Sequence, residues 1–137
     1  MTESHGGLTI THIGHGAFID RGAGVRTIPL AGAQFGASRI SAGLTELDVG
    51  REIPLHVHNC DEFVLVLEGR ASIRIGAEEY EVAAMDTTQI LEGFTHRFRN
   101  IGVNPLRIVW SYGDVNVQRT LVEAGITLGL LDSYPAS

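Results

Sequence analysis

Apolar and polar residues alternate with a period of two along much of the chain. The clearest case is residues 70–76, where Ala71, Ile73 and Ile75 would share one face of a strand. No segment of ten or more residues carries the 3.6-residue apolar period of a helix. Glycine-rich turns separate the runs at roughly the eight- to twelve-residue spacing of a β-sandwich or barrel. The pattern therefore predicts an all-β fold with little helix, its other strands within residues 8–13, 25–30, 37–47, 53–58, 62–69, 79–84, 87–93, 95–101 and 105–112.

The two ends of the chain are less regular than its middle. Residues 14–24 are rich in glycine and predict an irregular excursion, and residues 116–129 are ambiguous between a strand and a short helix. We therefore expect one domain in three parts. Residues 1–35 would join N-terminal strands to the barrel, residues 36–115 would form its core, and residues 116–137 would pack on the barrel or on a partner subunit.

Composition narrows the possible functions. The 137 residues carry a net charge of −6 and show no basic patch, which argues against nucleic-acid binding. All ten basic residues are arginine, so no lysine can form a Schiff base or act as a general base. The single cysteine rules out an internal disulfide framework. With no apolar run of membrane-spanning length and no signal-peptide pattern at the start, a cytoplasmic protein is the expectation.

The first candidate for chemistry lies within residues 53–69. His56 and His58 are two apart in a predicted strand, so their side chains share a face. Glu62 follows a three-residue connection, and a hairpin there would fold it back beside the two histidines. Burying two imidazoles and a carboxylate without a partner is costly, and a metal ion would supply that partner.

At this point the sequence resembles the cupin family. Gly50, His56, His58, Glu62 and Gly69 match the spacing of the first cupin motif. Gly93, His96 and Asn100 match the second motif, in which the expected glycine and proline are replaced by Met85 and Leu91. The resemblance implies a single double-stranded β-helix, or jelly-roll, barrel.

The same resemblance implies that His56, His58, Glu62 and His96 bind one divalent transition metal ion per chain. Three imidazoles and a carboxylate suit Fe, Mn, Ni, Cu, Co or Zn. The alternative is a site that holds no ion, or an ion that only ties strands together.

The alternation of side chains along each strand predicts which residues lie near this site. Val64 and Val66 share a face with Glu62, and Phe98 shares one with His96, so these side chains should line a substrate pocket. Trp110 and Tyr112 share a face and either close the pocket or pack in the core. Two polar residues complete the set: Gln89 faces either the ligand or the surface, and Glu46 is a possible acid or base at the pocket mouth.

The leading hypothesis is an enzyme that acts on a small, oxygen-rich organic molecule. With a redox metal it would be a dioxygenase, and with a Lewis-acid metal an isomerase, cyclase or lyase. The ligand set does not separate these chemistries. The alternatives are a non-catalytic module that binds a sugar or an acid, and a structural role. We also expect a homodimer, because cupins commonly pair and pairing removes exposed strand edges.

Overall fold

The structure, a computed structural model, describes residues 2–135, with only the backbone at position 15. In this range the chain forms fourteen strands and two short 3-10 turns, Ile13–His15 and Ala33–Phe35. None of the helices in residues 2–135 is long and apolar enough to cross a membrane. The strands are β1 (Thr2–His5), β2 (Leu8–Thr11), β3 (Ile19–Gly22), β4 (Val25–Ala31), β5 (Ser41–Leu47), β6 (His56–His58), β7 (Glu62–Glu68), β8 (Arg70–Ile75), β9 (Glu78–Ala83), β10 (Thr87–Ile90), β11 (His96–Asn100), β12 (Leu106–Tyr112), β13 (Gln118–Leu121) and β14 (Ile126–Gly129).

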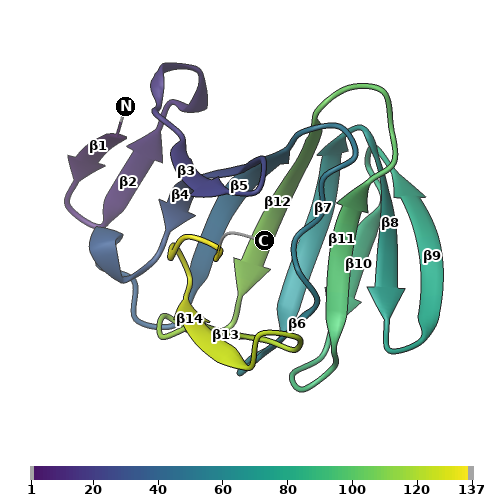
Figure 1. Ribbon diagram of the computed structural model, residues 1–137. Helices are drawn as coiled ribbons and strands as arrows, with labels where there is room; N and C mark the ends of the chain where they lie inside the picture. Colours follow the sequence, from purple (N-terminus) through teal and green to yellow (C-terminus); the bar gives the residue numbers. More distant parts are fainter. Residues whose placement is uncertain (1, 136–137) are drawn as a thin grey trace.

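Two six-stranded antiparallel sheets face each other and enclose the core (Figure 1). One sheet has the order β10-β7-β12-β5-β4-β3, and the other has the order β14-β13-β6-β11-β8-β9. The β1–β2 hairpin forms a separate small sheet that stands apart from both (Figure 1). The prediction of an all-β jelly-roll with little helix is confirmed.

Alternation of side chains fills the space between the sheets. On β8, Ala71 and Ile73 are buried while Arg74 is exposed, as the period of two predicts. Val64 and Val66 point inward from β7 in the opposite sheet and join the same apolar cluster. Strand β8 also forms a hairpin with β9, and the two strands pair along the whole length of β8.

The connection between β6 and β7 differs from the prediction. These strands do not form a hairpin, since β6 belongs to one sheet and β7 to the other. Residues 59–61 form a corner that carries the chain across the sandwich. The Asn59 side chain fixes one end, accepting from the Gln118 amide at 2.8 Å, and an Asp61 carboxylate oxygen accepts from the Glu92 amide at 2.9 Å. Glu62 therefore approaches the histidines from the facing sheet.

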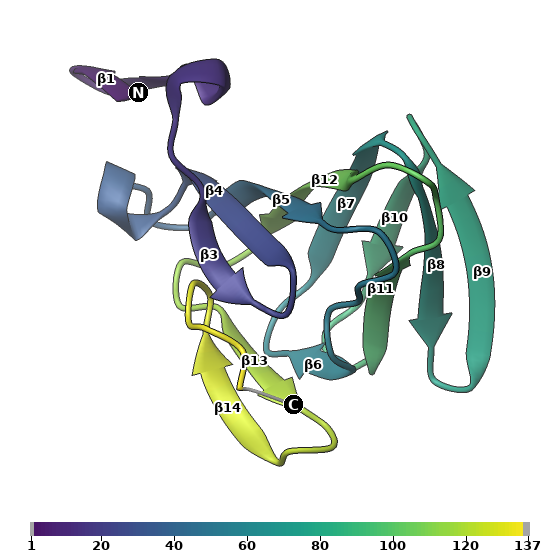
Figure 2. The same cartoon turned by 45° about the horizontal axis from the view of Figure 1, so that its top comes forward.

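The ends of the chain are more ordered than the sequence suggests. Part of the excursion predicted at residues 14–24 is strand β3, which pairs with β4 and becomes a sheet edge. The ambiguous segment at residues 116–129 is a hairpin of two strands, β13 and β14, and not a helix. Figure 2 shows this hairpin, in yellow and green, beneath the β3–β4 hairpin at one open side of the sandwich. The Tyr134 amide then donates to the Arg21 carbonyl at 2.8 Å, so the C-terminal segment joins the two sheets there.

Candidate metal centre

Two pairs of opposed residues meet at the centre of the sandwich. In one sheet, His96 on β11 is the register partner of His56 on β6. In the other sheet, Tyr112 on β12 is the register partner of Glu62 on β7. His58 shares the inward face of β6 with His56. All five side chains are buried, so the two sheets bring them together in the interior.

The three histidines form a compact cluster. Their ring centroids are separated by 4.3 Å for His56 and His96, 4.7 Å for His56 and His58, and 5.3 Å for His58 and His96. One ligand nitrogen from each ring lies within 4.8 Å of the others. This spacing allows one ion to contact all three imidazoles.

A main-chain carbonyl orients each ring. The Nδ1 atom of His56 donates to the Pro54 carbonyl at 2.6 Å, and that of His96 donates to the Phe94 carbonyl at 2.9 Å. His58 Nδ1 donates in the same way to the Gln118 carbonyl at 3.1 Å. Because a carbonyl oxygen only accepts, each Nδ1 must carry the proton, which leaves the Nε2 lone pairs for the cluster.

Glu62 adds the carboxylate that this arrangement needs. One of its oxygens lies 3.0 Å from His96 Nε2, and the other lies 3.7 Å from His58 Nε2. Imidazole lone pairs and a carboxylate repel one another unless a cation lies among them. The donor set and its orientation therefore fit a divalent metal ion held by three neutral imidazoles and one carboxylate.

Burial tunes these groups for metal binding. It lowers the pKa of His58 to about 4 and lowers the pKa of His56 well below its ordinary range, so both rings are neutral near pH 7. Burial alone would raise the pKa of Glu62, but its contacts with His96, His58 and Tyr112 outweigh burial and lower that pKa. The Glu62 carboxylate is thus ionised and the His56 and His58 imidazoles are neutral, which are the forms that bind metal.

Tyr112 brings a hydroxyl to the same cluster. Its Oη atom lies 3.1 Å from His58 Nε2, and its ring centroid is 4.7 Å from that of His58. Burial and then the charge of Glu62 raise the pKa of Tyr112 well above its ordinary value. The phenol therefore keeps its proton and is a hydrogen-bond donor beside the histidines.

The other nominated residues divide between the interior and the outer surface. Val64, Val66 and Phe98 are buried in the apolar core that surrounds the cluster. Trp110 is buried too, and its Nε1 donates to the Thr45 hydroxyl at 2.7 Å. Two of the nominated residues, Gln89 and Glu46, lie away from the cluster. Gln89 is exposed on β10, and the Glu46 carboxylate accepts from Arg26 and Arg107 on the opposite face of β5 from Thr45.

Sequence reasoning missed two buried arginines beside this site. Arg119 on β13 is the register partner of His58, so its side chain lies on the same inward face of the sheet. Arg21 on β3 is also buried, and both guanidinium groups lie against the Tyr134 ring. One signal could have placed Arg119 inside. It alternates with polar residues and shares a strand face with the apolar Val117 and Leu121.

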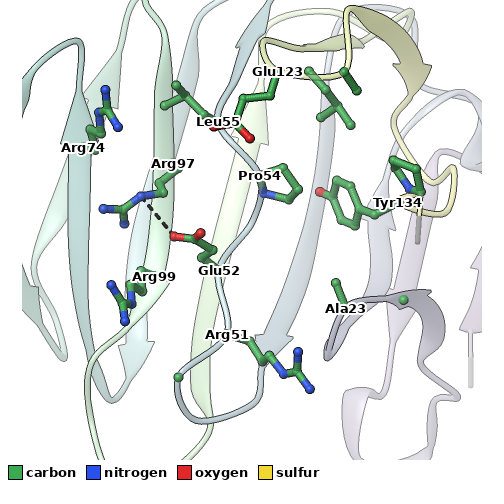
Figure 3. Close-up of a pocket in the computed structure, with 15 residues that line it drawn as sticks. Ala23, Arg51, Glu52, Pro54, Leu55, Arg74, Arg97, Arg99, Glu123 and Tyr134 are labelled. Atoms are coloured by element: carbon green, nitrogen blue, oxygen red, sulfur yellow. Dashed lines mark ion pairs between the residues drawn. The ribbon is translucent and has the colours of Figure 1, made fainter. Parts of the chain in front are cut away.

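A separate cleft opens on the outer side of the β6–β11–β8 region (Figure 3). Its volume is about 1050 Å³, and none of the three clustered histidines lines it. Figure 3 shows Arg74, Arg97 and Arg99 along one wall, with Arg97 paired to Glu52 at 3.2 Å. Tyr134 lines the opposite side, so this residue belongs both to the cleft and to the buried arginine pair.

Comparison with known proteins agrees with this architecture. The family model of the cupin domain matches residues 43–112, just over half of the chain. The polyketide synthase protein CurC of Streptomyces cyaneus is 34% identical over 91 residues, which make up 66% of this chain and 58% of that protein. The chain thus spans less than two thirds of the length of the curated relatives it matches, 58% and 59%.

Solved structures show the same fold at low sequence identity. The polyketide cyclase RemF from Streptomyces resistomycificus matches with a TM-score of 0.68 and 18% identity, covering 77% of this chain and 78% of that one. An RmlC-like cupin from Shewanella frigidimarina matches with a TM-score of 0.69 and 15% identity, covering 82% of this chain and 93% of that one. At these identities the likeness concerns the fold alone.

Proposed function

The chain belongs to the cupin domain family, and on that premise we propose that it is a mononuclear metal-dependent enzyme acting on a small, oxygen-rich organic molecule. One observation carries the proposal. Three buried imidazoles, each with Nδ1 committed to a main-chain carbonyl, bring their remaining nitrogens into one cluster, and the ionised Glu62 carboxylate lies beside two of them. His56, His58, His96 and Glu62 would hold the ion.

Within that class we favour cyclisation of a polyketone by an aldol-type closure. The acidic C–H between two carbonyls loses its proton to water, the carbon bonds to another carbonyl carbon of the same chain, and that carbonyl oxygen takes up a proton. The names of CurC, a polyketide synthase protein, and of the fold neighbour RemF, a polyketide cyclase, motivate this choice. A divalent ion bound here would supply Lewis-acid activation of a carbonyl oxygen, or redox chemistry with O2 if it were iron.

The chain's own residues supply binding, shielding and a proton. Val64, Val66 and Phe98 surround the cluster with apolar surface, which excludes water and strengthens the polar contacts made there. Tyr112 Oη carries a proton at neutral pH and can donate it to an oxygen that develops negative charge beside His58.

The first test is the metal content of the purified protein. Prepared without a histidine tag and measured by inductively coupled plasma mass spectrometry, the protein is expected to carry about one divalent ion per chain. His96→Ala should lose that ion because it removes one of three imidazoles. His5→Ala, which changes an exposed histidine of β1, should keep it. A wild-type protein that takes up none of the six candidate ions would overturn the enzyme proposal and favour a metal-independent binding module.

A second test concerns the proton on Tyr112. Tyr112→Phe is expected to keep the metal and the fold while lowering kcat by about 100-fold on a polyketone that the wild type cyclises. Activity would be followed by product formation under anaerobic conditions, with oxygen uptake measured in parallel. Oxygen consumption coupled to turnover would replace cyclisation with a dioxygenase reaction, and unchanged kcat in Tyr112→Phe would remove the tyrosine from the mechanism.

A further inference from the structure

Arg119 is a buried cation that faces the metal cluster. Its residue is only 4% exposed, and the register of β13 with β6 places it opposite His58, on the face that carries the histidines. Two of its nitrogens, Nε and Nη1, are buried and have no hydrogen-bond partner. Leaving charged donors unpaired in the interior is expensive, so the fold keeps them at a cost to its own stability.

Arg21 lies nearby and is equally buried, with 1% exposure. Its Nε and Nη2 both donate to the Asp132 carbonyl, at 3.3 and 3.2 Å, and its guanidinium lies 4.6 Å from the centre of the Tyr134 ring. The Arg119 guanidinium lies 5.5 Å from the same ring centre. Two cations thus share one aromatic neighbour on the same side of the interior.

The interior of the described part of the chain holds one carboxylate, Glu62, to balance these two cations, and Arg119 also interacts with it and with Tyr112. Within residues 2–135, no side-chain carboxylate forms an ion pair with Arg21 or Arg119. The arginines that do form ion pairs with carboxylates, such as Arg26, Arg97 and Arg107, lie on the outer faces of the sheets. Glu62 is the one buried carboxylate of the described residues, and it belongs to the metal-ligand set. The region is therefore electropositive even before a divalent ion is added, which favours an anionic ligand.

We propose that Arg119 binds the carboxylate of the substrate, with Arg21 as the second positive charge of the same subsite. The orphaned Nε and Nη1 atoms are the donors that a carboxylate oxygen would satisfy. Tyr134 lies beside both guanidinium groups and also lines the outer cleft. This carboxylate subsite lies beside the metal ligands, so the proposal rests on the function proposed above. A substrate that fills both would be a keto acid or a related carboxylate.

The test is calorimetric titration with benzoate, using benzamide as the neutral probe of the same shape. Wild-type protein is expected to bind benzoate, and Arg119→Met should weaken that binding by about ten- to 100-fold, the effect of losing a charged hydrogen bond. Benzamide should bind more weakly than benzoate to the wild type and equally to both proteins. Both titrations are run on the protein as purified and again after chelation of metal, so that failure of the anion subsite is separated from absence of an ion.

Arg97→Met is the matched control, because Arg97 is also buried but lines the outer cleft, where it forms ion pairs with Glu52 and Glu79. It should leave benzoate binding unchanged. Loss of binding in Arg97→Met instead of Arg119→Met would place the anion in the cleft and overturn the proposal, as would equal affinity in Arg119→Met and wild type.

Stability gives an independent readout. Arg119→Met removes two buried donors that have no hydrogen-bond partner, along with a charge that interacts with Glu62 and Tyr112. Because these effects oppose each other and the side chain keeps its length, the variant should unfold at about the same urea concentration as the wild type. A marked drop in that midpoint, together with unchanged benzoate affinity, would make Arg119 a structural residue and contradict the subsite.

Discussion

At His58, burial makes the neutral imidazole the stable form, which couples this residue to the pH dependence of folding. Its pKa is lowered from 6.5 to about 4, so between these values an unfolded chain binds a proton that the folded protein does not. Stability should therefore be complete above pH 6.5 and fall as the pH drops toward 4. In chelator-treated protein the expected loss is about 1.4 kcal/mol per pH unit across this window for each histidine so buried.

Urea unfolding followed by circular dichroism across that range measures the slope. His58→Gln should flatten it, since the substituted side chain does not titrate. His5→Gln, in the exposed β1 strand, should leave it unchanged. Equal slopes in the wild type and His58→Gln would show that burial of this imidazole does not control the pH dependence of stability.

Individual residues differ in how far the sequence reveals them. The spacing of His56, His58 and Glu62 marks them because ligand side chains must share a face or meet across a short connection. Arg119 carries a weaker mark: it alternates with Val117 and Leu121, but an arginine in an ambiguous segment is ordinarily a surface residue. Its position became clear only with the β13–β6 register, which depends on contacts far apart in the sequence.

At the scale of the secondary-structure elements, the turn from β9 to β10 departs from the cupin sequence motif, and the departure strains the backbone. Met85 stands where the second cupin motif has glycine, and it adopts a φ of 74°. That left-handed conformation is unfavourable for a residue with a Cβ atom and natural for glycine. Met85→Gly is therefore expected to raise the free energy of unfolding by about 0.5–1 kcal/mol, because relief of strain exceeds the added entropy of the unfolded chain.

Chemical denaturation of Met85→Gly beside Met85→Ala separates strain from the loss of the side chain. Alanine keeps the strain, and the Met85 side chain is largely exposed, so Met85→Ala should match the wild type within about 0.5 kcal/mol. Stabilisation in both variants would assign the effect to the exposed methionine instead of the backbone.

Strands with clean alternation were predictable, and the connections between them were less so. The β8–β9 hairpin follows from local pattern and turn residues, whereas the β6–β7 corner looks like a hairpin in the sequence. A hairpin forms when the next strand pairs within the same sheet, and a corner forms when the next strand joins the facing sheet. In this chain the Asn59 and Asp61 side chains, bonded to distant backbone amides, hold the crossing.

At the scale of the whole molecule, the outer side of β7 exposes apolar side chains, and we propose this strand as the interface of the expected homodimer. Phe63 and Leu67 are exposed on the outer side of β7, next to the half-buried Leu65. Such surface is commonly covered by a partner in solution. We expect sedimentation equilibrium to give the mass of a dimer at micromolar concentration, and Phe63→Asp to shift it toward the monomer.

Tyr80→Asp is the control for added charge, because Tyr80 is an exposed aromatic residue on β9 of the other sheet. It should leave the mass unchanged. A wild-type protein that is monomeric at every concentration would contradict the dimer, and dissociation by Tyr80→Asp alone would move the interface to the opposite sheet.

The three carbonyls that hold the imidazole rings have a consequence for how such a site can diversify. The oxygens of Pro54, Phe94 and Gln118 are main-chain atoms, so replacing those residues' side chains leaves the acceptors in place. Most point substitutions at these three positions should therefore leave the orientation of the imidazole rings unchanged. Sequences that diverge from this chain would keep the same ring orientation. Substitutions at neighbouring residues such as Tyr112 and Arg119 could then change the reactivity of the site while the ligand residues stay in place.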